Sequence, residues 1–424
     1  MLILDSFGIA ILGSTMVLGR MLTNHIKEFG ANGKACIWGD GFRSDVMNAA
    51  MANGAFMHCT ELEDCHRWSF HHATCATVPA AMAFADQYGA SGQDLITAVT
   101  AGIEITCRIG VGTKLAADAN KRGWHAVGAL GGFGGAVTFG KLLQMDEKKM
   151  AQALSLGGTQ PVGIWATCYD MSKRFHAGKA ASNGVLAALL ANRGVTGGTK
   201  ILEAKHGSFS QIMCENFDLG VMTRGLGREW ETSKTALKPY PCKRLFHTAI
   251  DGLLKIVKEH NPHPDQIERI IISSGDIVTL KPFSPPVDQY DAQINFAFLL
   301  AVAVYDGDMF IEQLRAENLK SKAINEFAAN KIKFESDPEL TKDFPRTFTA
   351  RCFVKMKDGK EFKAESDYPL GEPENPMSKE EAIQKFRRTA AYAIDGWRID
   401  QLIERVSHLE KEGNAANLTP LLHL

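Results

Sequence analysis

Apolar residues in the first half of the chain recur at the spacing of a helix. Between residues 95 and 103 they lie three and four positions apart, and residues 91–94 (Ser-Gly-Gln-Asp) supply a helix start ahead of them. The same spacing predicts helices over about 147–156 and 183–192. Residues 1–230 are rich in Ala, Gly, Leu and Met and poor in strand signals. We therefore predict that this half is helical.

The pattern changes about half-way along the chain. Residues 238–241 (Lys-Pro-Tyr-Pro) exclude a continuous helix, because each proline favours extended geometry at the residue before it. A helix is expected over 248–260, and β-rich or alternating residues predict strands over 267–273 and 347–356. Lys-Asp-Gly-Lys at 357–360 predicts a hairpin turn, after which the chain returns as a further strand.

Together these patterns predict a mainly α protein of two domains. A large all-helical domain comprises residues 1–234 with 370–424, and a smaller α+β domain comprises residues 235–369. The length of 424 residues supports this division, since single cores stop growing at roughly 250–300 residues. A linker with three prolines spans 369–376, and a capping sequence at Ser378 starts a C-terminal helix. We expect this tail to pack back on the helical domain.

Two apolar stretches, residues 1–21 and 126–140, resemble membrane segments at first sight. Glycines and polar residues interrupt the first, and Asp5 stands where a signal peptide needs a positive charge. The second is too short for a span and carries six glycines. We predict that both are internal helices, the second closely packed, and that the protein is not a membrane protein.

Charge and cysteine content narrow the class of protein further. The formal net charge is -1, which argues against a nucleic-acid-binding surface because such a surface needs an excess of Lys and Arg. The nine cysteines are odd in number, scattered and without a CxxC pair. This distribution indicates a reducing, cytoplasmic location without a disulfide framework.

The densest reactive stretch runs from His58 to Cys75 and contains histidines, cysteines and carboxylates. These side chains suit zinc, but their spacing fits no usual zinc pattern and HExxH is absent. A polar loop with incidental histidines is a second interpretation. An acid/base loop is the third, because imidazoles and carboxylates exchange protons near neutral pH. The residues alone leave these interpretations open.

Three further segments carry candidate chemistry. His125 precedes a glycine-rich stretch that does not match GxGxxG and follows no predicted strand, so close helix packing is favoured over dinucleotide binding. A helix starting after His125 can also hold a carboxylate at its N-terminus. Residues 173–179 form a basic cluster between two helical stretches, either a solvated turn or a clamp for an acidic substrate. Residues 238–247 form another, at the predicted domain boundary where pockets are favoured.

The ordered set of motifs resembles the MmgE/PrpD family, the 2-methylcitrate dehydratase-like proteins. The matching segments begin with Asn53-Gly54 and His58, continue with Glu61-Leu62-Glu63-Asp64-Cys65-His66, His72-Ala73 and Val78-Pro79-Ala80, and include Arg122-Gly123-Trp124-His125, Lys173-Arg174-Phe175-His176-Ala177-Gly178, Lys238-Pro239-Tyr240-Pro241-Cys242 with His247 and Asp251, Gly371-Glu372-Pro373-Glu374-Asn375-Pro376-Met377, and Lys385-Phe386-Arg387. Each motif is modest, but together they span nearly the whole chain in the family's order.

The resemblance implies a helical domain plus an α+β domain in a homodimer that uses no metal and no cofactor. The family's reactions include dehydration of 2-methylcitrate, decarboxylation of cis-aconitate and epimerisation of iminodisuccinate. The implied catalytic residues are Glu61, His72, His125, Lys173 and Lys238, and the implied substrate-binding residues are His66, His176 and Lys243.

This sequence departs from the family pattern at three of these motifs. Glu61 stands where the family has Asp, Cys65 where it has Thr, and Lys243 where the decarboxylases have His. The family also has helices ahead of the segment that residues 1–5 resemble, so an N-terminal helix is expected to be missing.

We expect a metal-independent hydro-lyase whose substrate is a small polycarboxylate such as 2-methylcitrate. Lysines would bind the carboxylates, while His125 or His72 removes a proton next to a carboxylate and the other histidine protonates the leaving hydroxyl. Glu61 would orient one imidazole. Decarboxylation or epimerisation of a related acid, and a relative that binds ligand without turnover, are the alternatives.

Overall fold

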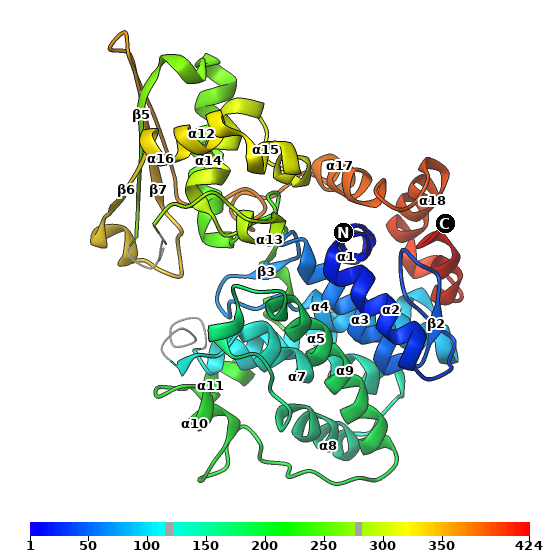
Figure 1. Cartoon of the computed structure of the whole chain (residues 1–424). Helices are drawn as coiled ribbons and strands as arrows, with labels where there is room; N and C mark the ends of the chain where they lie inside the picture. Colours follow the sequence, from blue (N-terminus) through cyan, green and yellow to red (C-terminus); the bar gives the residue numbers. More distant parts are fainter. Residues whose placement is uncertain (115–121, 276–281) are drawn as a thin grey trace. The chain divides into compact units, whose positions relative to one another are not determined.

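The computed structural model describes residues 1–114, 122–275 and 282–424 (Figure 1). Contacts divide the chain into two compact units, one of Met1–Ala236 with Ser378–Leu424 and one of Leu237–Met377. The sequence placed the boundaries after residues 234 and 369. In the structure they fall after residues 236 and 377, so the proline-containing stretch 369–376 belongs to the smaller unit.

The first unit is helical. Its α-helices among the described residues are α1 (Leu2–Ser14), α2 (Val17–Phe29), α3 (Val46–Cys59), α4 (Thr74–Tyr88), α5 (Gly92–Gly112), α7 (Ala126–Leu142), α8 (Glu147–Gly158), α9 (Ser172–Asn192), α10 (Phe209–Met213), α11 (Leu219–Thr223), α17 (Lys379–Ala390) and α18 (Gly396–Ser407). The unit also contains short 3-10 helices at Trp165–Thr167, Glu231–Lys234, Leu409–Lys411 and Ala415–Leu421. The two-residue strands are β1 (Ala35–Cys36), β2 (Arg43–Ser44), β3 (Cys65–His66) and β4 (Thr235–Ala236), which pair antiparallel as β1–β2 and β3–β4.

Small residues allow the central helices of this unit to pack closely. Helix α7 packs against α5 and α9, and α9 in turn packs against α3 (Figure 1). A Cβ added to Gly184 of α9 would lie 2.7 Å from the backbone nitrogen of Ala136 of α7. The glycine-rich stretch is therefore a close-packing surface and not a nucleotide loop, as the sequence predicted.

The second apolar stretch is an internal helix, whereas the first is not one helix: α1 ends at Ser14, and Val17 and Met21 of α2 are exposed. Helix α1 is buried from Leu4 to Gly13, and α7 is buried from Ala126 to Gly140. By length and composition, one described helix, α5, is sufficient to cross a membrane, and α1 with α2 would pass only as a pair bent by 82°. Because 67% of the apolar window of α5 is buried inside the protein, α5 has the character of a core helix.

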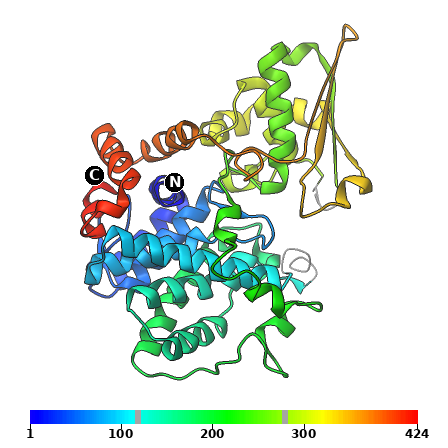
Figure 2. The same cartoon turned by 180° about the vertical axis from the view of Figure 1, so that it is seen from behind.

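The second unit is a four-stranded sheet covered by helices on one face, as both views show (Figures 1 and 2). Its strands are β5 (Ile267–Ser274), β6 (Ile332–Ser336), β7 (Ala350–Met356) and β8 (Glu361–Ser366), in the order β6-β5-β7-β8. Its helices are α12 (His247–His260), α13 (Gln289–Ala292), α14 (Phe296–Asp306), α15 (Ala316–Lys320) and α16 (Lys322–Lys331), with 3-10 helices at Arg244–Phe246, Pro264–Gln266, Ile311–Leu314 and Pro338–Thr341.

Several local predictions are confirmed by this architecture. Strands β7 and β8 form the predicted hairpin, and Ser378 and Glu381 form the predicted capping box at the start of α17. Helix α17 packs against α1, so the C-terminal tail does return to the helical unit. The fold class, a helical domain plus an α+β domain, is confirmed. The sequence did not reveal β6, which pairs parallel with β5 after the helical segment.

Candidate active site

The acidic loop begins where α3 ends. Asp45 caps the start of α3, Thr60 follows its last residue, and Glu61 adopts a left-handed backbone with φ of 55°. A non-glycine residue in this region is strained, and such strain concentrates at functional sites. The loop continues through Glu63 and Asp64 to β3, and the carboxylates of Glu61, Glu63 and Asp64 are all buried.

Glu61 forms a buried ion pair with the start of helix α9. The Lys173 ammonium donates a hydrogen bond to the Glu61 carboxylate, and the Arg174 guanidinium lies 3.7 Å from the same oxygen. The sequence placed residues 173–179 between two helical stretches and helix 183–192 after them. This was wrong, because α9 begins at Ser172 and these residues form its first two turns. The packing of α9 against α3 and α7 buries that end of the helix, which makes a solvated turn impossible there.

The second carboxylate of the loop, Glu63, contacts two imidazoles. His58 Nδ1 lies 3.0 Å from Glu63 Oε1, and His72 Nε2 lies 3.5 Å from the same oxygen. We expected Glu61 to orient an imidazole. Instead, Glu63 is the carboxylate that contacts the imidazoles, while Glu61 pairs with the cations of α9.

Four imidazoles come together beside these carboxylates. The His58 ring stacks on the His125 ring with centroids 5.4 Å apart, and the His72 ring lies 5.4 Å from that of His58. His125 Nδ1 lies 3.2 Å from His176 Nδ1. His58 comes from α3, His72 precedes α4, His125 is the N-cap residue of α7, and His176 lies in α9. Four separate segments therefore build one cluster, with predicted catalytic residues His72 and His125 inside it.

Burial keeps three of these imidazoles uncharged near neutral pH. It holds the pKa of His125 well below its usual range, and the nearby His58 and Lys173 add to this effect. Burial, with help from His58 and Lys173, lowers the pKa of His176 to about 4. Burial also lowers the pKa of His58, although Glu63 opposes the shift. An uncharged imidazole offers a lone pair to a proton or a cation, although a lowered pKa makes it a weaker base.

Further polar residues position the loop. Burial raises the pKa of Asp64 to about 7, and its carboxylate accepts hydrogen bonds from the backbone N–H groups of Ala73 and Thr74 at 3.0 and 3.1 Å. His66 was predicted to bind substrate. Its Nδ1 lies 2.8 Å from Ser69 Oγ and its Nε2 lies 3.1 Å from Glu231 Oε2, in a fully buried position. With both nitrogens engaged, His66 is better suited to hold β3 in place.

Lys238 and Lys243 belong to the second unit. Lys238 is fully buried, and Lys243 is half-buried immediately before the 3-10 helix Arg244–Phe246. In the same unit the Arg244 guanidinium binds Glu372 Oε1 at 2.8 Å. Their roles as substrate ligands stay predictions from the sequence.

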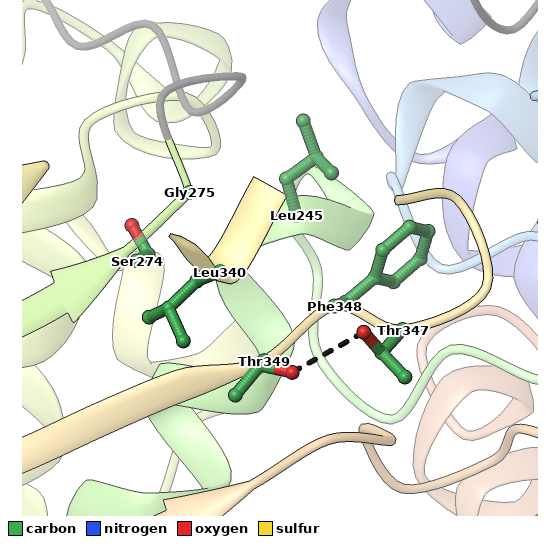
Figure 3. Close-up of a pocket in the computed structure, with 7 residues that line it drawn as sticks. All are labelled: Leu245, Ser274, Gly275, Leu340, Thr347, Phe348 and Thr349. Atoms are coloured by element: carbon green, nitrogen blue, oxygen red, sulfur yellow. Dashed lines mark hydrogen bonds between the residues drawn. The ribbon is translucent and has the colours of Figure 1, made fainter. Parts of the chain in front are cut away.

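The second unit has a small cavity beside the 3-10 helix Arg244–Phe246. It is lined by Leu245, Ser274, Gly275, Leu340, Thr347, Phe348 and Thr349 (Figure 3). Its volume of about 10 Å³ is near the minimum for one water molecule. A polycarboxylate does not fit in this space.

Comparison with known proteins identifies the family of this chain. The model of the MmgE/PrpD N-terminal domain matches residues 1–221, and that of the MmgE/PrpD C-terminal domain matches residues 240–409. The chain belongs to the MmgE/PrpD family. Similar curated proteins include a cis-aconitate decarboxylase of Aspergillus terreus (strain NIH 2624 / FGSC A1156), 27% identical over 449 residues that cover 100% of this chain and 90% of the relative.

Two mammalian relatives are named for the same activity and have a similar identity to this chain. The cis-aconitate decarboxylases of Mus musculus and Homo sapiens are each 27% identical over 439 residues, which cover 99% of this chain and 88% and 89% of theirs. The likeness therefore extends over both domains and not over one motif.

Sequence reasoning did not select several residues in and around the imidazole cluster. His58 and Glu63 were noticed in the reactive stretch but not chosen, although their separation by five residues across a helix end was a usable signal. Arg174 was seen only as part of a basic cluster. Cys168, which ends the 3-10 helix Trp165–Thr167 beside His125 and His176, gave no local signal at all.

Proposed function

We propose that this protein is a lyase that acts on a small tricarboxylate and removes water by first abstracting a proton next to a carboxylate. The observation that carries the proposal is the cluster of four imidazoles beside the Glu61–Lys173 pair. Uncharged imidazoles accept protons, and a lysine beside them can bind a carboxylate. A base-first elimination needs both kinds of group.

The elimination uses groups of this chain only as acid, base and charge partner. His125 accepts the proton from the carbon next to a carboxylate, and the electron pair moves into that carboxylate. Lys173 stabilises the negative charge that develops there, because a fixed cation acts most strongly in a buried site. The carbon–oxygen bond then breaks, and His72 gives its proton to the leaving hydroxyl so that water departs. Glu63, 3.5 Å from His72, stabilises the positive charge on that imidazole before the transfer.

Decarboxylation is the second candidate. It is favoured by the names of the relatives, since the A. terreus, mouse and human proteins are all cis-aconitate decarboxylases. In that reaction the carbon–carboxylate bond breaks, CO₂ leaves, and a carbon of the substrate gains a proton. Identity of 27% leaves the reaction of this chain to be tested directly.

Other features of the site and the assembly remain part of the proposal. We propose that Lys238 and Lys243 bind carboxylates of the substrate and that His176 lines the substrate site. We also propose that the enzyme is a cytoplasmic homodimer. These statements rest on the family resemblance.

A turnover screen tests the function. Chelator-treated protein is mixed with 2-methylcitrate, citrate, cis-aconitate and related acids, and the reaction is followed by alkene absorbance and proton NMR in deuterated water. A new alkene formed from a hydroxy acid supports the hydro-lyase. Release of CO₂ from cis-aconitate assigns decarboxylation instead. A lack of turnover and of α-proton exchange with every acid would contradict the lyase.

A further inference from the structure

Cys168 lies next to two imidazoles that the proposed reaction uses. One ligand atom from each of His125, Cys168 and His176 falls within 4.8 Å of the others, and all three side chains are buried. His125 starts α7, Cys168 ends the 3-10 helix Trp165–Thr167, and His176 lies in the second turn of α9. The group differs from the His58–Cys75 stretch that the sequence considered for zinc.

We propose that His125, Cys168 and His176 bind a divalent cation of the zinc class, and that occupation of this site inhibits the enzyme. Two imidazole nitrogens and one thiolate are a donor set that zinc accepts in proteins. The inhibition half rests on the proposed role of His125 as the base, whereas the binding half does not depend on any reaction.

Spacing of the nitrogens supports the site. His125 Nδ1 and His176 Nδ1 are 3.2 Å apart. Two nitrogens on one tetrahedral zinc are expected roughly 3.3–3.4 Å apart, from zinc–nitrogen bonds of about 2.0–2.1 Å. The two nitrogens therefore need little movement, while the Cys168 sulfur, which falls within 4.8 Å of them, has to lie roughly 3.6 Å from each in a tetrahedral site.

The outer nitrogen of His176 is also held in the manner of a metal ligand. His176 Nε2 lies 3.3 Å from Thr167 Oγ1, which leaves Nδ1 directed at His125. Metal-binding histidines commonly use their second nitrogen for such a hydrogen bond, because it sets the ring orientation. The 3.2 Å contact between the two Nδ1 atoms is a hydrogen bond, so one of them carries a proton, and that ring must hold its proton on Nε2 instead when a metal binds between the two rings.

Gly163 lies against both His125 and His176. Its carbonyl accepts the backbone N–H of His125 at 3.0 Å, and its own φ is 99°. A Cβ at this position would lie 3.0 Å from His176 Nδ1 and 3.1 Å from the His125 Cβ. A glycine therefore keeps open the space in which the ion would sit.

Binding changes the protonation of one ligand and leaves room for another. The Cys168 thiol loses its proton to solvent as the sulfur–metal bond forms, and the metal draws one lone pair from each imidazole. Three protein ligands in the described part of the chain leave a fourth tetrahedral position for water or a substrate carboxylate. A metal on His125 removes the lone pair that the elimination requires, so turnover stops.

Cobalt(II) and zinc test the binding half. Chelator-treated protein is titrated with cobalt(II), and zinc uptake is measured by equilibrium dialysis. The proposal expects one zinc per chain, a thiolate-to-cobalt charge-transfer band and tetrahedral visible bands. Cys168→Ser should abolish the charge-transfer band and weaken zinc binding at least about tenfold, comparable to the loss seen when ligand-orienting partners are removed.

Cys214→Ser is the matched control, because Cys214 is another buried cysteine and lies outside the cluster. It should keep the cobalt band and the zinc affinity. Zinc X-ray absorption on the unmodified protein should show one sulfur and two imidazole ligands, which tests the site even if Cys168→Ser does not fold. Absence of zinc binding, or a cobalt band that survives in Cys168→Ser, would overturn the site.

Activity tests the inhibition half separately. Zinc should stop turnover of the unmodified enzyme, a chelator should restore it, and Cys168→Ser should need at least about tenfold more zinc for the same inhibition. Full turnover with zinc bound would overturn the inhibition and remove His125 from the mechanism. If no acid is turned over at all, the proposed function fails, while the cobalt spectrum still decides the metal site.

Discussion

The first unit buries one lysine–carboxylate pair in the imidazole cluster and another between α1 and α17. Lys173 binds Glu61 among His58, His125 and Arg174, on a loop with a strained residue. Lys385 lies 2.8 Å from Asp5 Oδ1 and 2.7 Å from the carbonyl oxygen of Leu62. Charge and burial are alike, but the surroundings differ.

The comparison shows how to separate a functional ion pair from an anchoring one. Lys385 joins two helices and a loop carbonyl, so its hydrogen bonds connect elements of the fold. Lys173 pairs with Glu61 beside four imidazoles, and in the proposed reaction its charge also faces the substrate. A buried ion pair adds little net stability against well-packed apolar residues, yet removal of one partner is costly. The two pairs should therefore respond differently to the same substitution.

His125→Ala is expected to have the largest effect on activity. Loss of a general base lowers turnover by about 10²–10⁴-fold, and the fold should persist. Steady-state kinetics and circular dichroism measure the two effects. His25→Ala, at an exposed position on α2, is the control and should retain full activity. Full activity in His125→Ala would remove this residue from the reaction.

Lys385→Met and Lys173→Met break the two pairs in the same way. Lys385→Met leaves Asp5 as an uncompensated buried charge and should lower the free energy of unfolding by about 3–5 kcal/mol. Lys173→Met should destabilise less, because Arg174 still lies 3.7 Å from Glu61, but it should lose most turnover. Urea unfolding and kinetics on both variants give the comparison.

Paired apolar substitutions sharpen this result. Asp5→Leu combined with Lys385→Met removes both charges and should recover much of the lost stability. Glu61→Leu combined with Lys173→Met should stay inactive however stable it is. Recovery of turnover in the second double variant would show that Lys173 is an anchor like Lys385.

Gly163→Ala tests how closely the imidazole pair must be held. The new Cβ would meet His176 and His125, and misplacement of catalytic groups by about 1 Å can cost 10²-fold in rate, so we expect a loss of about 10–100-fold. Gly89→Ala is the control, since φ at Gly89 is 79° and an added Cβ meets nothing within 4 Å. Both variants should lose about 1–3 kcal/mol of stability, because a side chain is strained at a positive φ. Equal activity of the two variants would contradict the role of Gly163.

Glu231→Gln has the smallest expected effect and concerns stability alone. Burial would raise the pKa of Glu231, but hydrogen bonds from His66 and Lys234 outweigh it and lower the pKa to about 2. Because the pKa is lower in the folded state, the carboxylate stabilises the fold above pH about 4.5, and this contribution is lost as pH falls toward 2. Thermal unfolding at pH 3 and pH 6 should show a smaller difference for Glu231→Gln than for the unmodified protein. An unchanged difference would contradict the pair.

Local chemistry in the sequence determined much of the fold. Helical spacing, the Ser378–Glu381 capping box and the Lys-Asp-Gly-Lys turn act over a few residues, so each was visible without tertiary structure. The ordered motifs also identified the family, because they report many positions at once. The parallel partner β6 was missed, since parallel pairing joins distant segments and leaves no short-range signal.

Only the tertiary structure decided which polar residues meet. Residues 173–179 resemble a solvated turn by composition, but packing of α9 against α3 and α7 buries Lys173 and directs it to Glu61. His125, Cys168 and His176 are separated by up to 51 residues and converge because three helix ends share one place. Their burial, which keeps the imidazoles uncharged, is a property of the packed helices. Sequence supplied the reactive groups, and packing gave them their partners and their protonation.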